Sequence, residues 1–237
     1  MDKEYLKNIL NTSQRCQRNW DLSKTIPKED IDIMIHAIKS SPSKQNERHF
    51  KVSVITDYDQ RYQIYNDTDN FAHGEDGINI EKFPNGEINY KRQSQLMGHL
   101  LFVFSRAKND LFRGGESYAG GDNVVKDYSD IGIAGKSEFD TPEKLEYMRK
   151  KYDSHGLHAI GISVGYLLLT AHILGYKTGC SGGFDPPIVK KITREEKPEV
   201  VVAVGIEDSN RTRTEEHFEK GRFFPTYDKD IEIDWIS

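Results

Sequence analysis

The sequence predicts a layered fold of the α/β or α+β class. Three runs of strand length, residues 49–56, 99–105 and 199–206, alternate with segments of helical periodicity. Helices that occur between strands pack as layers on the faces of a sheet. The 237 residues can enclose a substantial core, and neither a repeat nor a clear linker divides them. We therefore expect one domain over residues 1–237.

Two helices are predicted before the first strand. Residues 2–11 indicate a short helix, and residues 26–40 indicate an amphipathic one that has Pro27 in its first turn. The apolar residues of the second segment follow the 3.6-residue period: Ile31, Met34, Ile35 and Ile38. The alternating segment 49–56 then predicts a strand with one face in the core.

The middle of the chain is polar apart from one strand. Residues 57–95 contain polar turns, and Asn85–Gly86 within them is typical of a hairpin. The runs 99–105 and 199–206 are continuously apolar, which predicts central strands covered on both faces. Residues 107–140 include "FRGGESYAGGDN", which indicates a glycine-rich flap or insertion rather than core.

Three further helical segments and an apolar tail complete the pattern. Residues 141–152 predict a helix, and residues 156–175 carry no charge over a length that could span a bilayer. Because the surrounding chain is polar, we favour a buried helix, apolar all round, over a membrane span. Asp185 and Pro186 suit the N-cap and first position of another helix. The apolar residues near the C-terminus predict that the tail docks on a surface.

Composition limits the function classes. A formal net charge of −5 argues against a general binder of nucleic acids or membrane surfaces, although a local basic pocket remains open. Two cysteines form neither a disulfide framework nor a zinc motif. The charged N-terminus lacks the features of a signal peptide, so the expected location is cytoplasmic.

Several motif matches have a simpler structural interpretation. "GISVG" (161–165) fits the nucleophile elbow, but it lies within a helical pattern, so Ser163 is expected to be a core hydroxyl and the two glycines to admit a neighbouring helix. "HGLH" (155–158) and His172 lack ligand partners at metal spacing. "DTDNFAHGEDG" and "RGGESYAGG" lack required positions of the calcium loop and the P-loop.

Two short basic motifs stand at opposite ends of the chain. "QRCQRNW" (14–20) places Arg15 and Arg18 around the end of the first helix, and "KGR" carries Lys220 and Arg222. Each pair alone is typical of a solvated basic cluster. The loop "SSPSKQNERHF" (40–50) is rich in polar and charged residues for a simple helix-to-strand connection.

Taken in order, these motifs resemble the FMN-dependent nitroreductase superfamily over nearly the whole chain. "QRCQRNW" resembles its N-terminal arginine-rich phosphate motif, and "SPSKQNERHF" resembles its Pro-Ser-x-x-Asn loop. "GISVGYLLLTAHILGYKTGCSGGFD" is similar to its long central helix and following Gly-Phe-Asp turn. "KGR" takes the place of its C-terminal basic pair.

The resemblance implies an α+β fold of three-layer, α/β/α-like type, with a central mixed sheet flanked by helices. It also implies a domain-entwined homodimer with two interfacial FMN sites, each built from both chains. Guanidinium groups bind phosphate bidentately, and several cations are needed to bury a dianion. The resemblance places six residues at the FMN phosphate: Gln14, Arg15, Cys16, Arg18, Lys220 and Arg222. It places Pro42, Ser43, Lys44 and Asn46 along the isoalloxazine ring or the ribityl chain. It places Gly182 and Gly183 where a backbone N–H faces the flavin N5 atom.

The implied activity is oxidation of NADH or NADPH and ping-pong reduction of a nitroaromatic, quinone or flavin through bound FMN. Because the cofactor carries the hydride chemistry, we expect no catalytic acid or base and no metal. Dehalogenation, flavin breakdown or flavin binding without turnover are alternatives. Gln14, Cys16, Arg48 and Gly182 depart from the family pattern, and Asn89, Lys91 and Gln93 are the nearest candidates for further ring contacts.

Overall fold

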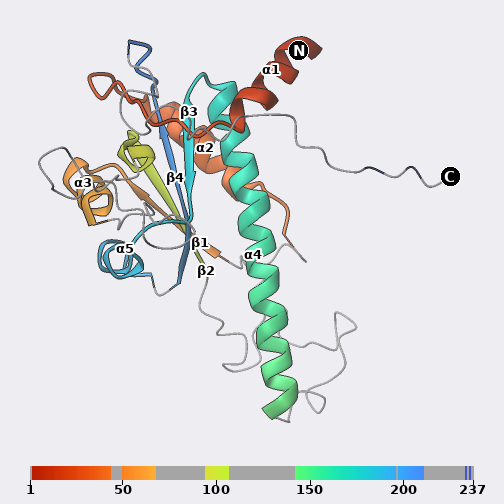
Figure 1. Ribbon diagram of the computed structural model, residues 1–237. Helices are drawn as coiled ribbons and strands as arrows, with labels where there is room; N and C mark the ends of the chain where they lie inside the picture. Colours follow the sequence, from red (N-terminus) through yellow and green to blue (C-terminus); the bar gives the residue numbers. More distant parts are fainter. Residues whose placement is uncertain are drawn as a thin grey trace, which may run out of the picture.

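Five α-helices, a short 3-10 helix and one four-stranded sheet form the described part of the protein (Figure 1). This computed structural model describes residues 2–43, 50–67, 94–106, 142–195 and 197–210, together with residues 233 and 235. The elements along the chain are α1 (Lys3–Ser13), α2 (Lys28–Lys39), β1 (Phe50–Ile55), α3 (Tyr58–Asp67), η2 (Ser94–Met97), β2 (Leu100–Arg106), α4 (Pro142–Ile173), β3 (Lys177–Ser181), α5 (Pro186–Thr193) and β4 (Pro198–Gly205).

The strands follow the order β1-β2-β4-β3, and each neighbouring pair is antiparallel. The sheet was expected to be mixed, but no parallel pair occurs among the described strands. Strands β2 and β3 run in the same direction, but they do not pair because β4 lies between them. The predicted central strands are β2 and β4, and β1 and β3 form the two edges.

Helices cover both faces of this sheet, which confirms the three-layer α+β prediction (Figure 1). Phe102 and Phe104 of β2 point to the side of α2 and α4, where they pack with Leu167. Leu101 and Val103 alternate to the opposite side, which α3, η2 and α5 cover. Full burial of each such side chain contributes about 1.5–3 kcal/mol, so the two cores stabilise the sheet from both sides.

One 32-residue helix, α4, joins the two helical segments predicted at 141–152 and 156–175. Its inner face packs against the sheet, but it is not buried all round as predicted. Four apolar residues of its outer face are between 42 % and 48 % exposed: Leu157, Ile162, Tyr166 and Ile173. The difference arises because a single sheet covers only one side of a helix. Residues 154–173 are long and apolar enough to cross a membrane, and 44 % of this window is buried in the fold.

The motif interpretations within α4 have different outcomes. Ser163 is fully buried and donates a hydrogen bond to the Ile38 carbonyl at 3.4 Å, which confirms a core hydroxyl. His172 is buried and lies 3.2 Å from the Thr178 hydroxyl. No described helix of this chain packs at Gly161 or Gly165, because a Cβ at either would meet no described atom within 4 Å.

Three elements, α3, η2 and β3, were missing from the sequence prediction. Helix α3 is polar, and its first turn is fixed locally because the Gln60 N–H donates to the Asp57 carboxylate at 2.9 Å. Strand β3 has five residues and a central glycine, so it lacks the apolar run of β2. Its pairing with β4 makes it a strand. Tertiary contacts therefore override a weak local pattern.

The start of α5 agrees with the prediction, and α1 has an N-cap that was not predicted. Asp2 accepts a hydrogen bond from the Glu4 N–H at 3.2 Å, and Pro186 occupies the start of α5 after Asp185. The Asn85–Gly86 hairpin, the flap at 107–140 and most of the tail lie outside the described residues. Of the tail, Ile233 and Trp235 are 70 % and 93 % exposed, so these two do not dock on the described core.

Candidate functional site

The segment after α1 lies along the free edge of β3. The Gln17 N–H donates to the Thr178 carbonyl at 2.7 Å, and the Cys16 thiol donates to the Cys180 carbonyl at 3.6 Å. Alternate carbonyls of an edge strand point outward, where the sheet itself offers no partner. The predicted phosphate motif is therefore held against a strand that follows it by about 160 residues.

Gly179 permits this close packing. A Cβ built on Gly179 would lie 2.8 Å from the Gln95 Cβ and 3.1 Å from the Gln17 carbonyl oxygen. Gln95, from η2, also donates from Nε2 to the Cys180 carbonyl at 3.2 Å. Three segments distant in the sequence thus meet at one glycine, which no larger residue can replace without displacing backbone.

The Gln17 side chain shapes the next turn of the chain. Its Oε1 accepts hydrogen bonds from the N–H groups of Arg18 and Asn19, at 2.7 and 3.0 Å. This arrangement fixes the backbone from which Arg18 extends. Arg18 is half-buried and Arg15 is exposed, and the two arginines stand on either side of Cys16 in the sequence.

Directly after β3, a tight turn carries the two predicted glycines. The Gly183 N–H donates to Ser181 Oγ at 3.2 Å. Gly182 is exposed, and a Cβ built on it would meet no described atom within 4 Å. The structure therefore brings the N-terminal motif to Cys180, two residues before Gly182. Burial, and second the nearby Cys16, raise the pKa of the Cys180 thiol to about 11.

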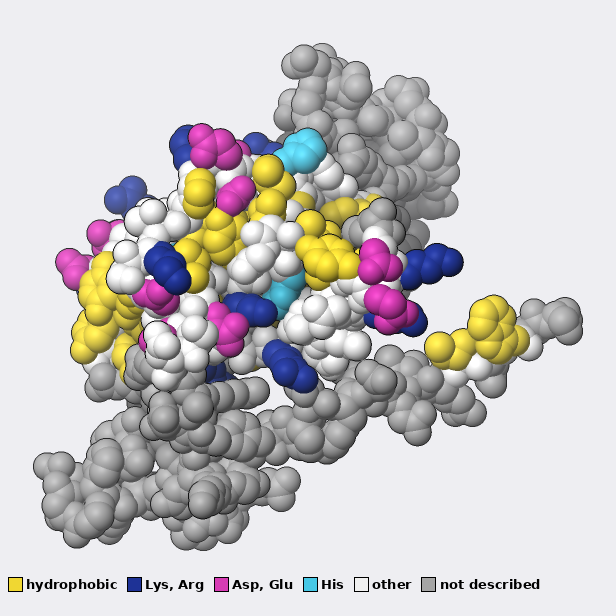
Figure 2. Space-filling view, turned by 90° about the horizontal axis from the view of Figure 1, so that it is seen from above, with side chains coloured by type: hydrophobic (Ala, Val, Ile, Leu, Met, Phe, Trp, Pro, Cys, Tyr) yellow, Lys and Arg dark blue, Asp and Glu magenta, His cyan; other side chains and the backbone are white. Residues whose placement is uncertain are grey.

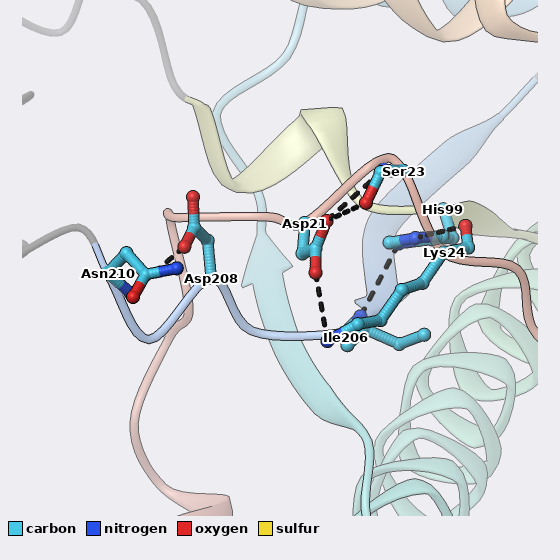
Figure 3. A network of polar contacts seen from close by, with 7 residues as sticks. All are labelled: Asp21, Ser23, Lys24, His99, Ile206, Asp208 and Asn210. Atoms are coloured by element: carbon cyan, nitrogen blue, oxygen red, sulfur yellow. Dashed lines mark hydrogen bonds and ion pairs between the residues drawn. The ribbon is translucent and has the colours of Figure 1, made fainter.

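A polar network ties the following residues to the end of β4 (Figure 3). The Asp21 N–H donates to the Ile206 carbonyl at 2.9 Å, and the Asp208 N–H donates to the Asn19 carbonyl at 3.1 Å. Hydrogen bonds from Ser23, and next the Lys24 ammonium, lower the pKa of Asp21 to about 2. The predicted phosphate motif thus has a fixed backbone on both sides.

His99 forms the centre of this network. The Ile206 N–H donates to Nδ1 at 3.4 Å, so Nε2 carries the proton and donates to the Lys24 carbonyl at 3.1 Å. Burial lowers the pKa of His99, which favours this neutral tautomer. A Cβ on Gly205 would lie 2.7 Å from His99 Nδ1, so the strand end and the ring are in close contact.

The second group of predicted residues begins at the end of α2, at the opposite edge of the sheet. Pro42 is exposed, and Ser43 lines a cavity of about 550 Å³ together with Phe50, Val52 and Val54 of β1. Three inter-strand gaps separate β1 from β3, which amounts to about 14 Å at ~4.8 Å each. The structure therefore does not bring Ser43 to Cys16 within one chain.

Four of the predicted residues, namely Lys44, Asn46, Lys220 and Arg222, lie outside the described residues, as do the ring-contact candidates Asn89, Lys91 and Gln93. Their roles stay predictions.

Sequence reasoning missed the residues that build the junction. Gln17 stands inside the basic motif, but the family resemblance points to Gln14, Arg15, Cys16 and Arg18, and Gln17 has no signal of its own. Cys180 was hidden because β3 itself was not predicted. Gln95 and His99 precede β2, and nothing in their local sequence indicates a contact with residues 17–24.

Comparison with known proteins identifies the family. The model of the nitroreductase family matches residues 12–206, which is most of the chain. The chain belongs to the nitroreductase family. No curated protein matches the sequence.

Solved structures share this nitroreductase fold at low sequence identity. A Bacillus subtilis protein named as a nitroreductase has a TM-score of 0.56 and 18 % identity, covering 94 % of this chain and 96 % of its own. A Staphylococcus epidermidis protein named as an NAD(P)H:FMN oxidoreductase has a TM-score of 0.54 and 16 % identity, with 92 % and 91 % covered. An Exiguobacterium sibiricum protein named as a nitroreductase and solved with FMN has a TM-score of 0.54 and 14 % identity, with 87 % and 90 % covered.

Proposed function

We propose that this nitroreductase-family protein is an FMN-dependent oxidoreductase that takes electrons from NADH or NADPH and reduces a small acceptor. Nitroaromatics, quinones and free flavins are the acceptor classes that we propose. The observation that carries the proposal is the junction at β3, where the Cys16 contact holds the segment that contains Arg15 and Arg18 against Cys180, two residues before Gly182. FMN supplies the hydride chemistry when bound.

The residues of this junction fit a flavin phosphate. Arg18 extends from a backbone that Gln17 fixes through its side chain and its N–H, and the Arg15 N–H donates to the Thr12 carbonyl at the end of α1. A preorganised guanidinium loses little freedom when it binds a dianion bidentately. Lys220 and Arg222 are proposed to complete the phosphate site. A local cationic site of this kind is compatible with the net charge of −5.

The turn after β3 fits the edge of a flavin ring. Gly182 is exposed and lacks described neighbours at its Cβ position, so a planar group could approach its backbone closely. We propose that backbone N–H groups of this turn donate to the ring. Such a donor would stabilise the reduced, anionic form of the flavin.

The proposed site needs a second copy of the chain. Ser43 and the proposed ligands Pro42, Lys44 and Asn46 belong to the loop that leaves α2 near β1, whereas the phosphate motif lies at β3. In a symmetric dimer, the loop from one protomer could meet the phosphate motif of its partner. Each site would then combine both chains.

Exposed apolar residues support a homodimer. The outer face of α4 carries Ile162 and Tyr166, and between them Gly165 leaves room for a partner helix. Trp235, in the tail, is almost fully exposed. On the end of the molecule that carries α1, hydrophobic side chains also lie at the surface among charged ones (Figure 2). Contiguous exposed apolar residues mark interaction surfaces.

Anaerobic spectroscopy tests the proposed activity. The purified protein, with added FMN where none is bound, should show a flavin absorption band that bleaches on addition of NADH or NADPH. Subsequent addition of a quinone or nitroaromatic should restore the band. A bound flavin that neither donor bleaches would favour a binding module, and failure to bind FMN after reconstitution would refute the proposal.

A charge-matched pair of variants tests the phosphate site. Lys220→Ala with Arg222→Ala should weaken FMN binding by at least tenfold, since each charged hydrogen bond contributes about 1.5–3 kcal/mol. Lys190→Ala with Lys191→Ala removes the same charge from α5 and should leave the affinity unchanged. Equal affinities in both double variants would exclude the assigned roles.

A further inference from the structure

The two cysteines of the chain meet in the fold. Cys16 and Cys180 are the only cysteines in the sequence, and both thiols are reduced and half-buried. They stand 164 positions apart, yet Cys16 Sγ lies 3.6 Å from the carbonyl oxygen of Cys180. A contact between the only two cysteine residues of a chain is a candidate for sulfur chemistry.

The two cysteine residues lie within side-chain reach of each other. The Gln17 to Thr178 hydrogen bond and the Cys16 to Cys180 contact hold the segment along the edge of β3. The Cys16 side chain already reaches the backbone of Cys180, since its Sγ lies 3.6 Å from the Cys180 carbonyl oxygen. Disulfides span Cα separations of about 4.4–6.8 Å. A disulfide here requires the two side chains to change rotamer so that the sulfurs approach each other.

The surroundings distinguish the two sulfurs. Burial raises the pKa of Cys180, which keeps it in the thiol form at neutral pH. Because peroxide reacts with thiolates and burial keeps Cys180 in the thiol form, Cys16 is the sulfur that peroxide oxidises first.

We propose that Cys16 and Cys180 form a reversible intramolecular disulfide when the protein meets hydrogen peroxide. The Cys16 sulfur attacks the peroxide, the O–O bond breaks, and sulfenic acid and water form. The Cys180 sulfur then attacks the Cys16 sulfur, and the hydroxyl group leaves as water with the remaining thiol proton. Two thiols and one peroxide thus give one disulfide and two waters.

This disulfide would fix the N-terminal motif to β3 covalently. It does not depend on the proposed oxidoreductase activity, because the peroxide is supplied and both sulfurs belong to the chain. The two proposals therefore fail independently, and neither a flavin nor an electron donor enters the measurement.

Peptide mapping of the full chain provides the test. The reduced protein is treated with a small excess of hydrogen peroxide, blocked with N-ethylmaleimide and digested without reduction. We expect a cross-linked pair of peptides that contain Cys16 and Cys180, and its loss after dithiothreitol. The melting temperature of the oxidised protein should rise by roughly 10 °C, because the bond closes a loop of more than 100 residues.

Single variants give the controls. Cys180→Ser should stop the reaction at Cys16 sulfenic acid, which dimedone traps, and Cys16→Ser should yield no cross-link. Mapping of the unmodified chain remains decisive if a variant fails to fold. Three results would overturn the proposal. They are sulfinic acids at both cysteines, N-ethylmaleimide adducts at both cysteines, and a disulfide that joins two chains.

Discussion

Gly179→Ala should loosen the junction between β3 and the N-terminal motif. The new methyl group would lie 2.8 Å from the Gln95 Cβ and 3.1 Å from the Gln17 carbonyl oxygen. Carbon atoms pack best at about 3.5–4.0 Å, so the neighbours must move by roughly 1 Å. Neither contact is the flexible end of a side chain, since one atom is a Cβ and the other belongs to the backbone.

The free energy of unfolding should fall by about 2–3 kcal/mol. Overpacking alone costs about 1–3 kcal/mol. Movement of Gln17 and Gln95 also weakens their hydrogen bonds to Thr178 and Cys180, each worth about 1 kcal/mol. For a chain of this size the loss corresponds to a melting temperature lower by roughly 5–10 °C.

Gly182→Ala is the matched control. Its methyl group would meet no described atom within 4 Å, so its stability should stay within about 0.5 kcal/mol of the original. Urea unfolding followed by circular dichroism measures both variants, and quenching of flavin fluorescence measures their FMN affinity. Gly182→Ala should lose affinity without losing stability. A Gly179→Ala protein as stable as the original would refute the packing argument.

Three further perturbations probe other parts of the molecule. Burial lowers the pKa of His172 from 6.5 to about 4. Between pH 6.5 and about 4, the unfolded chain therefore binds a proton at this imidazole that the folded chain does not bind. The free energy of unfolding should fall by up to about 3 kcal/mol as the pH drops through this range. Equal pH slopes in urea titrations of the wild type and His172→Gln would contradict this. Tyr176→Phe removes the hydroxyl that donates to the Asp30 carboxylate and should cost about 1–2 kcal/mol in chemical denaturation, whereas an unchanged midpoint would show that the bond contributes nothing. Ile162→Glu places a charge on the outer face of α4 and should yield monomers without bound FMN by light scattering, and a stable dimer would exclude this face from the interface.

Local patterns were sufficient where one residue type decides the structure. The period of Ile31, Met34 and Ile38 predicts α2, and the apolar run of β2 predicts a strand covered on both faces. The sequence could not reveal β3, because Gly179 and Cys180 become strand residues only through pairing with β4. Elements with weak local preferences depend on tertiary contacts.

The candidate site likewise contains residues that local sequence patterns reveal and contacts that they do not. The arginines at positions 15 and 18 are conspicuous by charge, and the glycines after β3 by composition. The contact between Gln17 and Thr178 has no local signal, since it joins residues that are remote in the sequence. Nor could spacing reveal that Ser43 and Cys16 occupy opposite edges of the sheet, because strand order is not written in any one segment.

That separation of Ser43 from Cys16 has a genetic consequence. If each site takes one edge from each protomer, a variant defective at Arg18 and another defective at Ser43 carry lesions in different halves. A mixed dimer would assemble one site from two damaged halves and the other from two intact halves. Random pairing of equal amounts would then restore about a quarter of the sites, although both parent proteins are inactive. Two defective alleles expressed together in one cell could therefore complement each other.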